Sequence, residues 1–185
     1  GWIERNRVLN SNQDISYIKV PMIKFNRHEK IKNVNINYSL NWENKIFAQL
    51  TSYKKAPFYN ETLNLIKSTF NFKHESISDL NIHIINTVCK YLGISFKFSV
   101  YSEMNLELED KIFSPGDWAF EISKHMSAKS YINLYGGIEL FDSKKFNSKN
   151  IELLFCENNL SIYKQKHNQF IKGLSIIDVL MFNSP

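Results

Sequence analysis

The apolar positions of the chain recur at two spacings, and the wider spacing predicts helices. Steps of three or four residues place side chains along one face of a helix. The clearest stripe, in a helix predicted over about residues 78–92 and ended by Gly93, is Ile77, Leu80, Ile84, Val88 and Tyr91. A second stripe, in a helix expected to be capped by Asn41, is Trp42, Ile46, Leu50 and Tyr53. A third, in the next helix along the chain, is Leu63, Ile66 and Phe70.

Alternation of apolar and polar residues predicts the strands. It occurs over residues 17–23, where Pro21 restricts the strand to the edge of a sheet, and over 33–38. Further strands are predicted over 96–100, 131–134, 151–155 and 160–163. A serine cap, a first-turn proline and an acid three residues after the cap predict a helix from the sequence Ser114-Pro115-Gly116-Asp117. A short last helix begins near Ser175.

The order of these elements predicts the fold class. From residue 96 onward strands and helices alternate, which is typical of parallel sheets. No repeat, low-complexity tract or proline-rich linker divides the chain. We therefore predict an α/β fold over residues 1–185: a single three-layer domain with a mostly parallel or mixed sheet flanked by helices.

Composition narrows the function classes. The 185 residues are 43% hydrophobic and 22% charged, as in globular proteins. The net charge of +5 comes mostly from dispersed lysines, so we expect no nucleic-acid partner. No apolar run reaches the roughly 20 residues of a membrane span. The two cysteines, Cys89 and Cys156, are too few for a disulfide framework, and the first residues lack the apolar core of a signal peptide. These features favour a cytoplasmic location.

The segment from Tyr131 to Asp142 is a candidate ligand site. A predicted strand holding Tyr131 and Asn133 leads into Gly136-Gly137 and a short helix. Glycines let a ligand approach the backbone, and free N–H groups at the start of a helix favour phosphate. A tight turn that needs positive φ angles would equally require glycine. Both interpretations remain open from the sequence.

Charged residues supply further candidates, each with a structural alternative. Glu139 and Asp142 are expected on one face of the short helix, either as general bases or as a solvated surface. Arg5 and Arg7 flank Asn6, and in an extended segment both guanidinium groups would project to one side and suit a phosphate. The alternative is two surface charges. The five histidines are too scattered to predict a metal site. Asp178 is interpreted as the acid of a capping pattern that begins at Ser175.

Several segments, taken in order, resemble the WbqC-like family, which is found with bacterial O-antigen (surface-polysaccharide) genes. They are residues 1–8, 53–59, 91–94, 131–142 and 174–182, together with Trp42 and Lys45. The family usually reads Gly-Trp-Ile-Asn-Arg-Asn-Arg-Ile where this chain begins. Members typically have a strand and loop before that motif, so we expect the chain to lack its N-terminal strand and loop. Trp118 stands where relatives often have arginine.

The resemblance implies a role in surface-polysaccharide biosynthesis, including O-antigen and lipopolysaccharide. It implies a transferase that acts on a nucleotide-linked or lipid-linked amino sugar and adds glycine or another amino acid. The alternative is a non-catalytic accessory protein that binds other enzymes of polysaccharide biosynthesis. No cofactor is indicated. We assign Glu139 and Asp142 as candidate catalytic residues; the candidate substrate-binding residues are Arg5, Asn6, Arg7, Tyr131, Asn133, Gly136 and Gly137.

Overall fold

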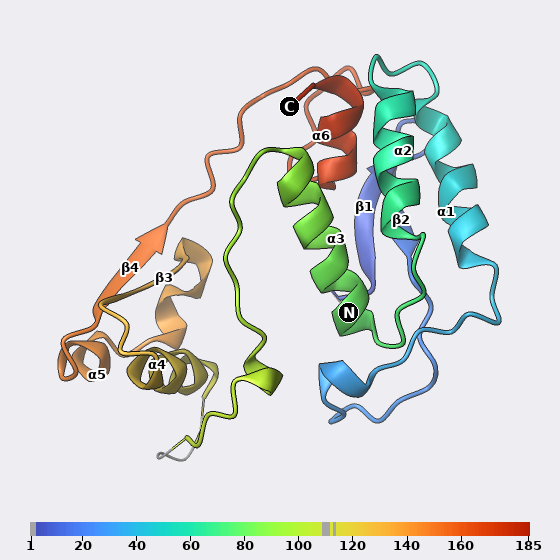
Figure 1. The fold of residues 1–185 in the computed structure, drawn as a ribbon. Helices are drawn as coiled ribbons and strands as arrows, with labels where there is room; N and C mark the ends of the chain where they lie inside the picture. Colours follow the sequence, from blue (N-terminus) through green and yellow to red (C-terminus); the bar gives the residue numbers. More distant parts are fainter. Residues whose placement is uncertain (1–2, 109–111, 113) are drawn as a thin grey trace. The chain divides into compact units, whose positions relative to one another are not determined.

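The computed structural model describes residues 3–108, 112 and 114–185, which group into two compact units (Figure 1). Unit 1 comprises Gly1–Lys97 and Leu160–Pro185, and unit 2 comprises Phe98–Asn159. The mixed α/β class predicted from the sequence is confirmed. The single domain expected over residues 1–185 stays a prediction.

Unit 1 combines a β-hairpin with helices. Strand β1 (Arg5–Leu9) pairs antiparallel with β2 (Ile15–Lys19), and Arg5 lies opposite Lys19. The helices of this unit are α1 (Trp42–Leu50), α2 (Tyr59–Thr69), α3 (Ile77–Tyr91) and α6 (Ile176–Phe182). Single 3-10 turns span Ile31–Asn33 and Thr51–Tyr53. Helix α1 contacts β2 and helix α6 contacts β1, so both strands are anchored to helices.

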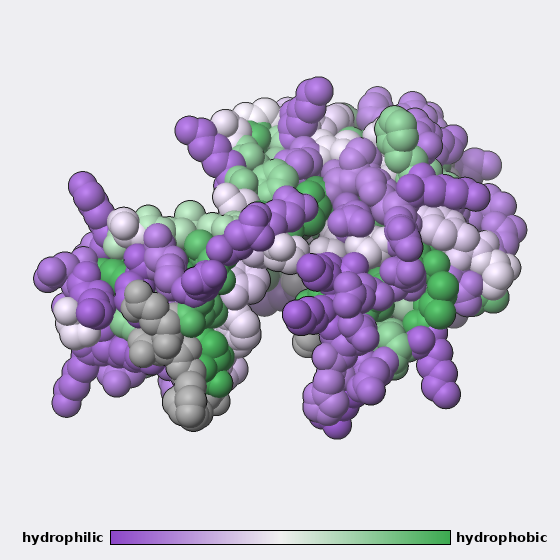
Figure 2. Space-filling view, turned by 60° about the horizontal axis from the view of Figure 1, so that its bottom comes forward, coloured by the Kyte–Doolittle hydropathy of each residue, from purple (hydrophilic) through white to green (hydrophobic). Residues whose placement is uncertain are grey.

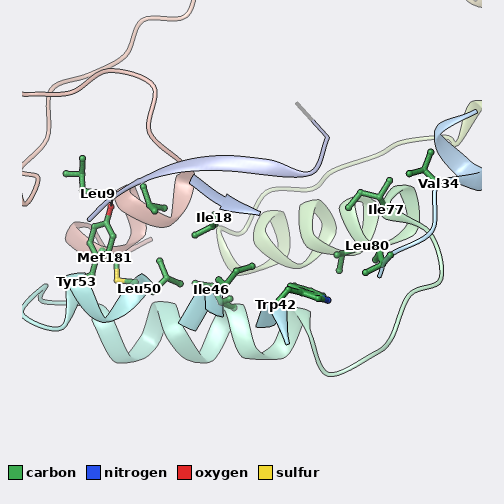
Figure 3. Packing of buried hydrophobic residues seen from close by; sticks show 13 residues of the cluster. Leu9, Ile18, Val34, Trp42, Ile46, Leu50, Tyr53, Ile77, Leu80 and Met181 are labelled. Carbon is green, nitrogen blue, oxygen red and sulfur yellow. Dashed lines mark hydrogen bonds between the residues drawn. The ribbon is translucent and has the colours of Figure 1, made fainter. Parts of the chain in front are cut away.

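The apolar stripes of the sequence form the core of unit 1 (Figure 3). Its buried members are Val8, Leu9, Ile18, Val34, Ile36, Trp42, Ile46, Leu50, Tyr53, Ile66, Ile77, Leu80 and Met181. Helix α3 begins where the Ser76 side chain accepts a hydrogen bond from the Asp79 N–H at 3.1 Å. It ends before Gly93, whose φ of 68° requires the left-handed region. The helix predicted over 78–92 is therefore confirmed to within one residue at either end.

Unit 2 is built around aromatic side chains. Its elements are α4 (Pro115–His125), β3 (Ser130–Leu134), α5 (Ser143–Asn147), β4 (Glu152–Cys156) and the 3-10 turns Tyr101–Glu103 and Tyr135–Leu140. Strands β3 and β4 are parallel, as predicted. The predicted capping box is present at the start of α4, where Ser114 and Asp117 each bond the main-chain N–H of the other. The core comprises Phe120, Phe146 and Ile151, with Ala119, Tyr131, Phe141 and Leu153 packed against them.

Several predicted elements are wrong in detail. The segments 96–100 and 160–163 form no strand, although both alternate in sequence. Phe96 and Phe98 are 46% and 44% exposed, so alternation there does not mark a buried sheet face. Residues 33–38 contribute only isolated bridges, Met22 with Ile36 and Asn35 with Ser76. The Asn41 side chain makes no capping hydrogen bond to α1.

Candidate functional site

Arg5 and Arg7 project to the same face of the hairpin, because the segment that holds them is an extended strand. The register puts Lys19 directly opposite Arg5 and Tyr17 opposite Arg7. The Arg5 guanidinium carbon lies 4.8 Å from the centre of the Tyr17 ring. Arg5 and Lys19 are exposed, and Tyr17 is 47% exposed. We call Arg5, Arg7, Tyr17 and Lys19 the hairpin face.

The hairpin face holds two cations opposite each other. Like charges on directly opposed positions of an antiparallel pair repel and destabilise the sheet. The cation–π contact of Arg5 with Tyr17 offsets part of this repulsion. An anion bound between Arg5 and Lys19 would remove the remaining repulsion between these two cations. The hairpin face therefore has the charge and the exposure to bind an anionic group.

Arg7 also has a structural role that the sequence did not predict. Its Nη2 donates to the carbonyl oxygen of Gly173 at 2.5 Å, and the Ser175 N–H donates to the Arg7 carbonyl at 2.8 Å. Gly173 has a φ of 68°, and a Cβ there would meet Arg7 Nη2 at 2.5 Å. Asn6, the motif residue between the two arginines, accepts from the Arg7 N–H at 2.9 Å. Arg7 thus fixes the turn that leads into α6.

The candidate residues of strand β3 pack mainly within unit 2. The Tyr131 ring centre lies 5.4 Å from that of Phe141 and 5.6 Å from that of Phe146, and burial raises the pKa of the Tyr131 phenol. The Asn133 side chain accepts from the Leu134 N–H at 2.7 Å. Tyr131 is therefore part of the aromatic core.

The glycine pair lies inside the 3-10 turn Tyr135–Leu140. Neither glycine has a positive φ, so the interpretation as a left-handed turn is wrong. A Cβ on Gly136 would meet no atom within 4 Å, and one on Gly137 would lie 3.4 Å from Asn133 Nδ2, an ordinary contact. The close backbone approach occurs instead at Gly116, where a Cβ would overlap the carbonyl oxygen of Leu140.

Glu139 and Asp142 do not share a helix face, contrary to the sequence expectation. Glu139 is exposed within the 3-10 turn, which ends at Leu140. Asp142 follows in extended backbone and caps α5, where its carboxylate accepts from the Lys144 N–H at 2.9 Å. Glu139 is thus the candidate base whose carboxylate is not used as a helix cap.

The sequence-assigned residues fall into two groups, each described within its own unit. Arg5, Asn6 and Arg7 belong to unit 1. The candidates of unit 2 are Tyr131, Asn133, Gly136, Gly137, Glu139 and Asp142. Their assignment to substrate binding and catalysis stays a prediction.

A buried hydrogen-bond network around Asp178 was missed by the sequence interpretation. Asp178 is fully buried on α6. Its two carboxylate oxygens accept from the Tyr53 hydroxyl at 2.7 Å and the Tyr163 hydroxyl at 2.8 Å. The Tyr53 oxygen accepts in turn from the Leu9 N–H at 2.7 Å. Burial raises the pKa of Asp178, although the two hydroxyl donors oppose that shift. The network joins β1, the turn after α1, the segment before α6, and α6 itself.

A second polar cluster surrounds Phe120 in unit 2. Glu121 is fully buried, with Lys124 Nζ 2.9 Å from its Oε2. Lys145 Nζ lies 2.6 Å from Asp117 Oδ1 and 4.9 Å from the centre of the Phe120 ring. The Lys145–Asp117 pair links α5 to α4 and is also a hydrogen bond, whereas the Glu121–Lys124 pair lies within α4. The Lys145–Asp117 pair therefore stabilises the contact between α4 and α5.

The tyrosines of the Asp178 network make the stability of unit 1 sensitive to alkaline pH. Burial, and then the Asp178 carboxylate, raise the pKa of Tyr53, and burial raises that of Tyr163. A raised pKa in the folded state contributes stability that is complete below the unfolded pKa of about 10 and is lost as pH rises above it. We expect the free energy of unfolding, measured with urea, to fall between pH 9 and 11. The Tyr163→Phe variant should reduce this slope and the exposed Tyr17→Phe should not; equal slopes in both would contradict the assignment.

Two further properties concern only the residues that the structure describes. Among them, no helix is long and apolar enough to cross a membrane. Within the same residues, no three or more histidine, cysteine, aspartate or glutamate side chains are grouped so that they could hold a metal ion.

The fold and the hairpin face define a mixed α/β protein with a cationic surface on a two-stranded sheet. The profile of the WbqC-like protein family matches residues 1–185, and the chain belongs to this family. It is 26% identical over 186 residues to the uncharacterized protein Rv1507c of Mycobacterium tuberculosis (strain ATCC 25618 / H37Rv), covering 98% of this chain and 77% of that protein. No solved structure matches the chain.

Proposed function

We propose that the protein is a cytoplasmic transferase of bacterial surface-polysaccharide synthesis, including O-antigen and lipopolysaccharide. Its substrate is an amino sugar carried on a nucleotide or lipid phosphate, and the transferred group is glycine or another amino acid. Membership of the WbqC-like family supports this setting. The observation that carries the choice of an anionic substrate is the exposed pair Arg5 and Lys19, opposed across the hairpin beside Tyr17.

Each unit holds candidate residues, and we propose their chemical roles unit by unit. The guanidinium of Arg5 and the ammonium of Lys19 bind phosphate oxygens, and the guanidinium can do so with two parallel hydrogen bonds. In the transfer step the amine of the sugar attacks the carbonyl carbon of an activated amino acid. An amide bond forms, the bond to the leaving group breaks, and a general base takes the amine proton; within unit 2, Glu139 is the candidate for that base. The glycines Gly136 and Gly137 leave the turn next to Glu139 without side chains, so a substrate can approach its backbone.

An accessory role is the second candidate, and an apolar surface favours it. The side of the β3–β4 pair that carries Ile132, Leu134 and Leu154 is exposed, with exposed fractions of 59%, 54% and 38%. Hydrophilic side chains otherwise cover much of the visible surface, with separate apolar patches between them (Figure 2). Contiguous apolar surface is typical of protein contacts, so this face suits another enzyme of polysaccharide biosynthesis. Catalytic turnover with a purified substrate would remove this candidate.

Binding of nucleotide-linked amino sugars tests the anionic substrate. In calorimetry with uridine- and thymidine-diphosphate amino sugars, we expect binding that Arg5→Ala weakens at least about tenfold, or ~1.4 kcal/mol. The reason is the loss of charged hydrogen bonds to phosphate. Arg27→Ala is the matched control, because Arg27 is an exposed arginine outside the hairpin.

Two outcomes would contradict the proposal, and each excludes a different part of it. Binding that is equally weakened by Arg5→Ala and Arg27→Ala would exclude the hairpin face as the site. Absence of binding across the whole panel would exclude free nucleotide sugars and leave a lipid-linked substrate or the accessory role.

A further inference from the structure

A pocket of about 470 Å³ lies within unit 1, between the hairpin and helices α2, α3 and α6. Its volume falls within the range of small-molecule sites. The wall is largely aliphatic. Its apolar members include Ile18, Val20, Ile66, Ile85, Val88 and Ile176.

The polar side chains of the wall mostly have partners inside the chain. Asn81, Thr62 and Thr69 each donate to a main-chain carbonyl oxygen, at 3.0, 2.9 and 2.7 Å. The Ser175 oxygen accepts from a main-chain N–H at 3.3 Å. A nucleobase or sugar needs several polar partners, and burying it against groups that are already engaged is unfavourable. The wall therefore favours an apolar occupant.

A peptide strand is a poor occupant, because the edge of β1 that does not pair with β2 already makes hydrogen bonds within the protein. The Arg7 carbonyl accepts from the Ser175 N–H at 2.8 Å. The Leu9 N–H donates to Tyr53 and its carbonyl accepts from the Ser52 hydroxyl, both at 2.7 Å. An added strand needs a continuous row of free main-chain groups, which this edge does not offer.

Charge and exposure give the pocket an orientation. Ile85 and Ile176 are 47% and 40% exposed, so the aliphatic wall reaches the surface at these residues. Arg5 and Lys19 also line the pocket, and both are exposed. Glu4, which is 6% exposed, is a buried residue of the same wall. A ligand with an apolar body and a negative end fits this arrangement, with the negative end toward the cations.

We propose that this pocket binds the hydrocarbon chain of an amphiphile whose phosphate head group lies at Arg5 and Lys19. The proposal adds an apolar subsite beside the proposed phosphate site, and for the identity of the head group it rests on the proposed function. Each methylene moved from water into the pocket contributes about 0.8 kcal/mol, which corresponds to about fourfold in affinity.

A series of n-alkyl phosphates tests the pocket directly. Octyl, decyl and dodecyl phosphate, each below its micelle-forming concentration, are titrated into the full chain by calorimetry. We expect affinity to rise roughly fifteenfold for each two added methylenes. Inorganic phosphate should bind far more weakly than any of the three. Affinity that does not change with chain length would overturn the proposal.

Two neighbouring residues of α3 supply matched variants. Ile85 lines the pocket, whereas Asn86 is exposed and does not line it. Ile85→Glu should weaken dodecyl phosphate binding at least tenfold, because the new carboxylate would lie against the dodecyl chain. Asn86→Glu should change the affinity by less than twofold. Because Ile85 is half-exposed, the variant should fold, and its circular dichroism spectrum checks this. Equal effects of both variants would overturn the proposal.

The two free cysteines provide a readout that needs no substitution. Cys89 lines the pocket and Cys156 is exposed in unit 2. Dodecyl phosphate should slow alkylation of Cys89 by iodoacetamide and leave the rate at Cys156 unchanged. Equal rates at Cys89 with and without the amphiphile would overturn the proposal.

A comparison of ligands distinguishes two sources of the hydrocarbon chain. It also separates the pocket proposal from the proposed transferase function. Tighter binding of farnesyl phosphate than of dodecanoate supports an isoprenoid carrier, and the reverse supports a fatty-acyl one. Binding that strengthens with hydrocarbon chain length, without transfer of an amino acid to an amino sugar, would support the pocket and contradict the transferase function. Arg5-dependent binding of nucleotide sugars without any chain dependence would support the anionic substrate and overturn the pocket.

Discussion

Replacement of Asp178 by alanine is expected to lower the free energy of unfolding by roughly 3–6 kcal/mol, since each of two hydrogen bonds to a charged group contributes about 1.5–3 kcal/mol. The substitution leaves the Tyr53 and Tyr163 hydroxyls without their acceptor inside the protein. It also loosens the support of the Leu9 N–H, which bonds the Tyr53 oxygen. The effect is large because the carboxylate is fully buried.

Urea denaturation followed by circular dichroism measures this loss. Asp142→Ala is the control, because Asp142 is an exposed helix cap and its removal should cost only about 1 kcal/mol. A loss of similar size in the two variants would contradict the structural importance of the Asp178 network.

Replacement of Gly116 by alanine is expected to destabilise unit 2 by about 3 kcal/mol, the upper part of the usual range for overpacking. The new Cβ would overlap the carbonyl oxygen of Leu140, which is main chain and cannot turn aside as a side chain can. Helix α4 and the turn after β3 would have to separate. The thermal midpoint of the variant should fall accordingly.

Gly136→Ala is the matched control for Gly116. A Cβ at Gly136 meets no atom within 4 Å, and its φ is not positive. Its stability should stay within about 0.5 kcal/mol of the unchanged protein, as for surface substitutions away from special features. A large loss of stability in Gly136→Ala with none in Gly116→Ala would contradict the close approach of Gly116 to the Leu140 carbonyl oxygen.

Local patterns in the sequence predict the helices well. The stripe of Ile77 and Leu80 and the capping box of Ser114 and Asp117 act between residues three positions apart, so the sequence alone reveals them. The alternating segments 96–100 and 160–163 show the limit. Alternation describes a strand only where a partner strand and a buried face exist, and both depend on distant parts of the chain.

The candidate site was predictable only in part, for the same reason. That Arg5 and Arg7 share a side follows from extended backbone alone. Their neighbours Tyr17 and Lys19 depend on the hairpin register, which the sequence analysis did not derive. Asp178 and Tyr53 are 125 positions apart, and a Ser-x-x-Asp pattern looks like a simple cap without that contact. Gly116 likewise needs the position of Leu140 to explain it.

A residue-resolved titration tests the central claim, an anionic sugar bound at the hairpin face. Uniformly 15N-labelled protein is titrated with a uridine-diphosphate amino sugar and, separately, with the same sugar carrying a lipid phosphate. Backbone amide signals of Arg5, Tyr17 and Lys19 are expected to shift in a saturable way with at least one of the two ligands. Saturable shifts elsewhere with these three signals unchanged, or no shifts with either ligand, would contradict the claim.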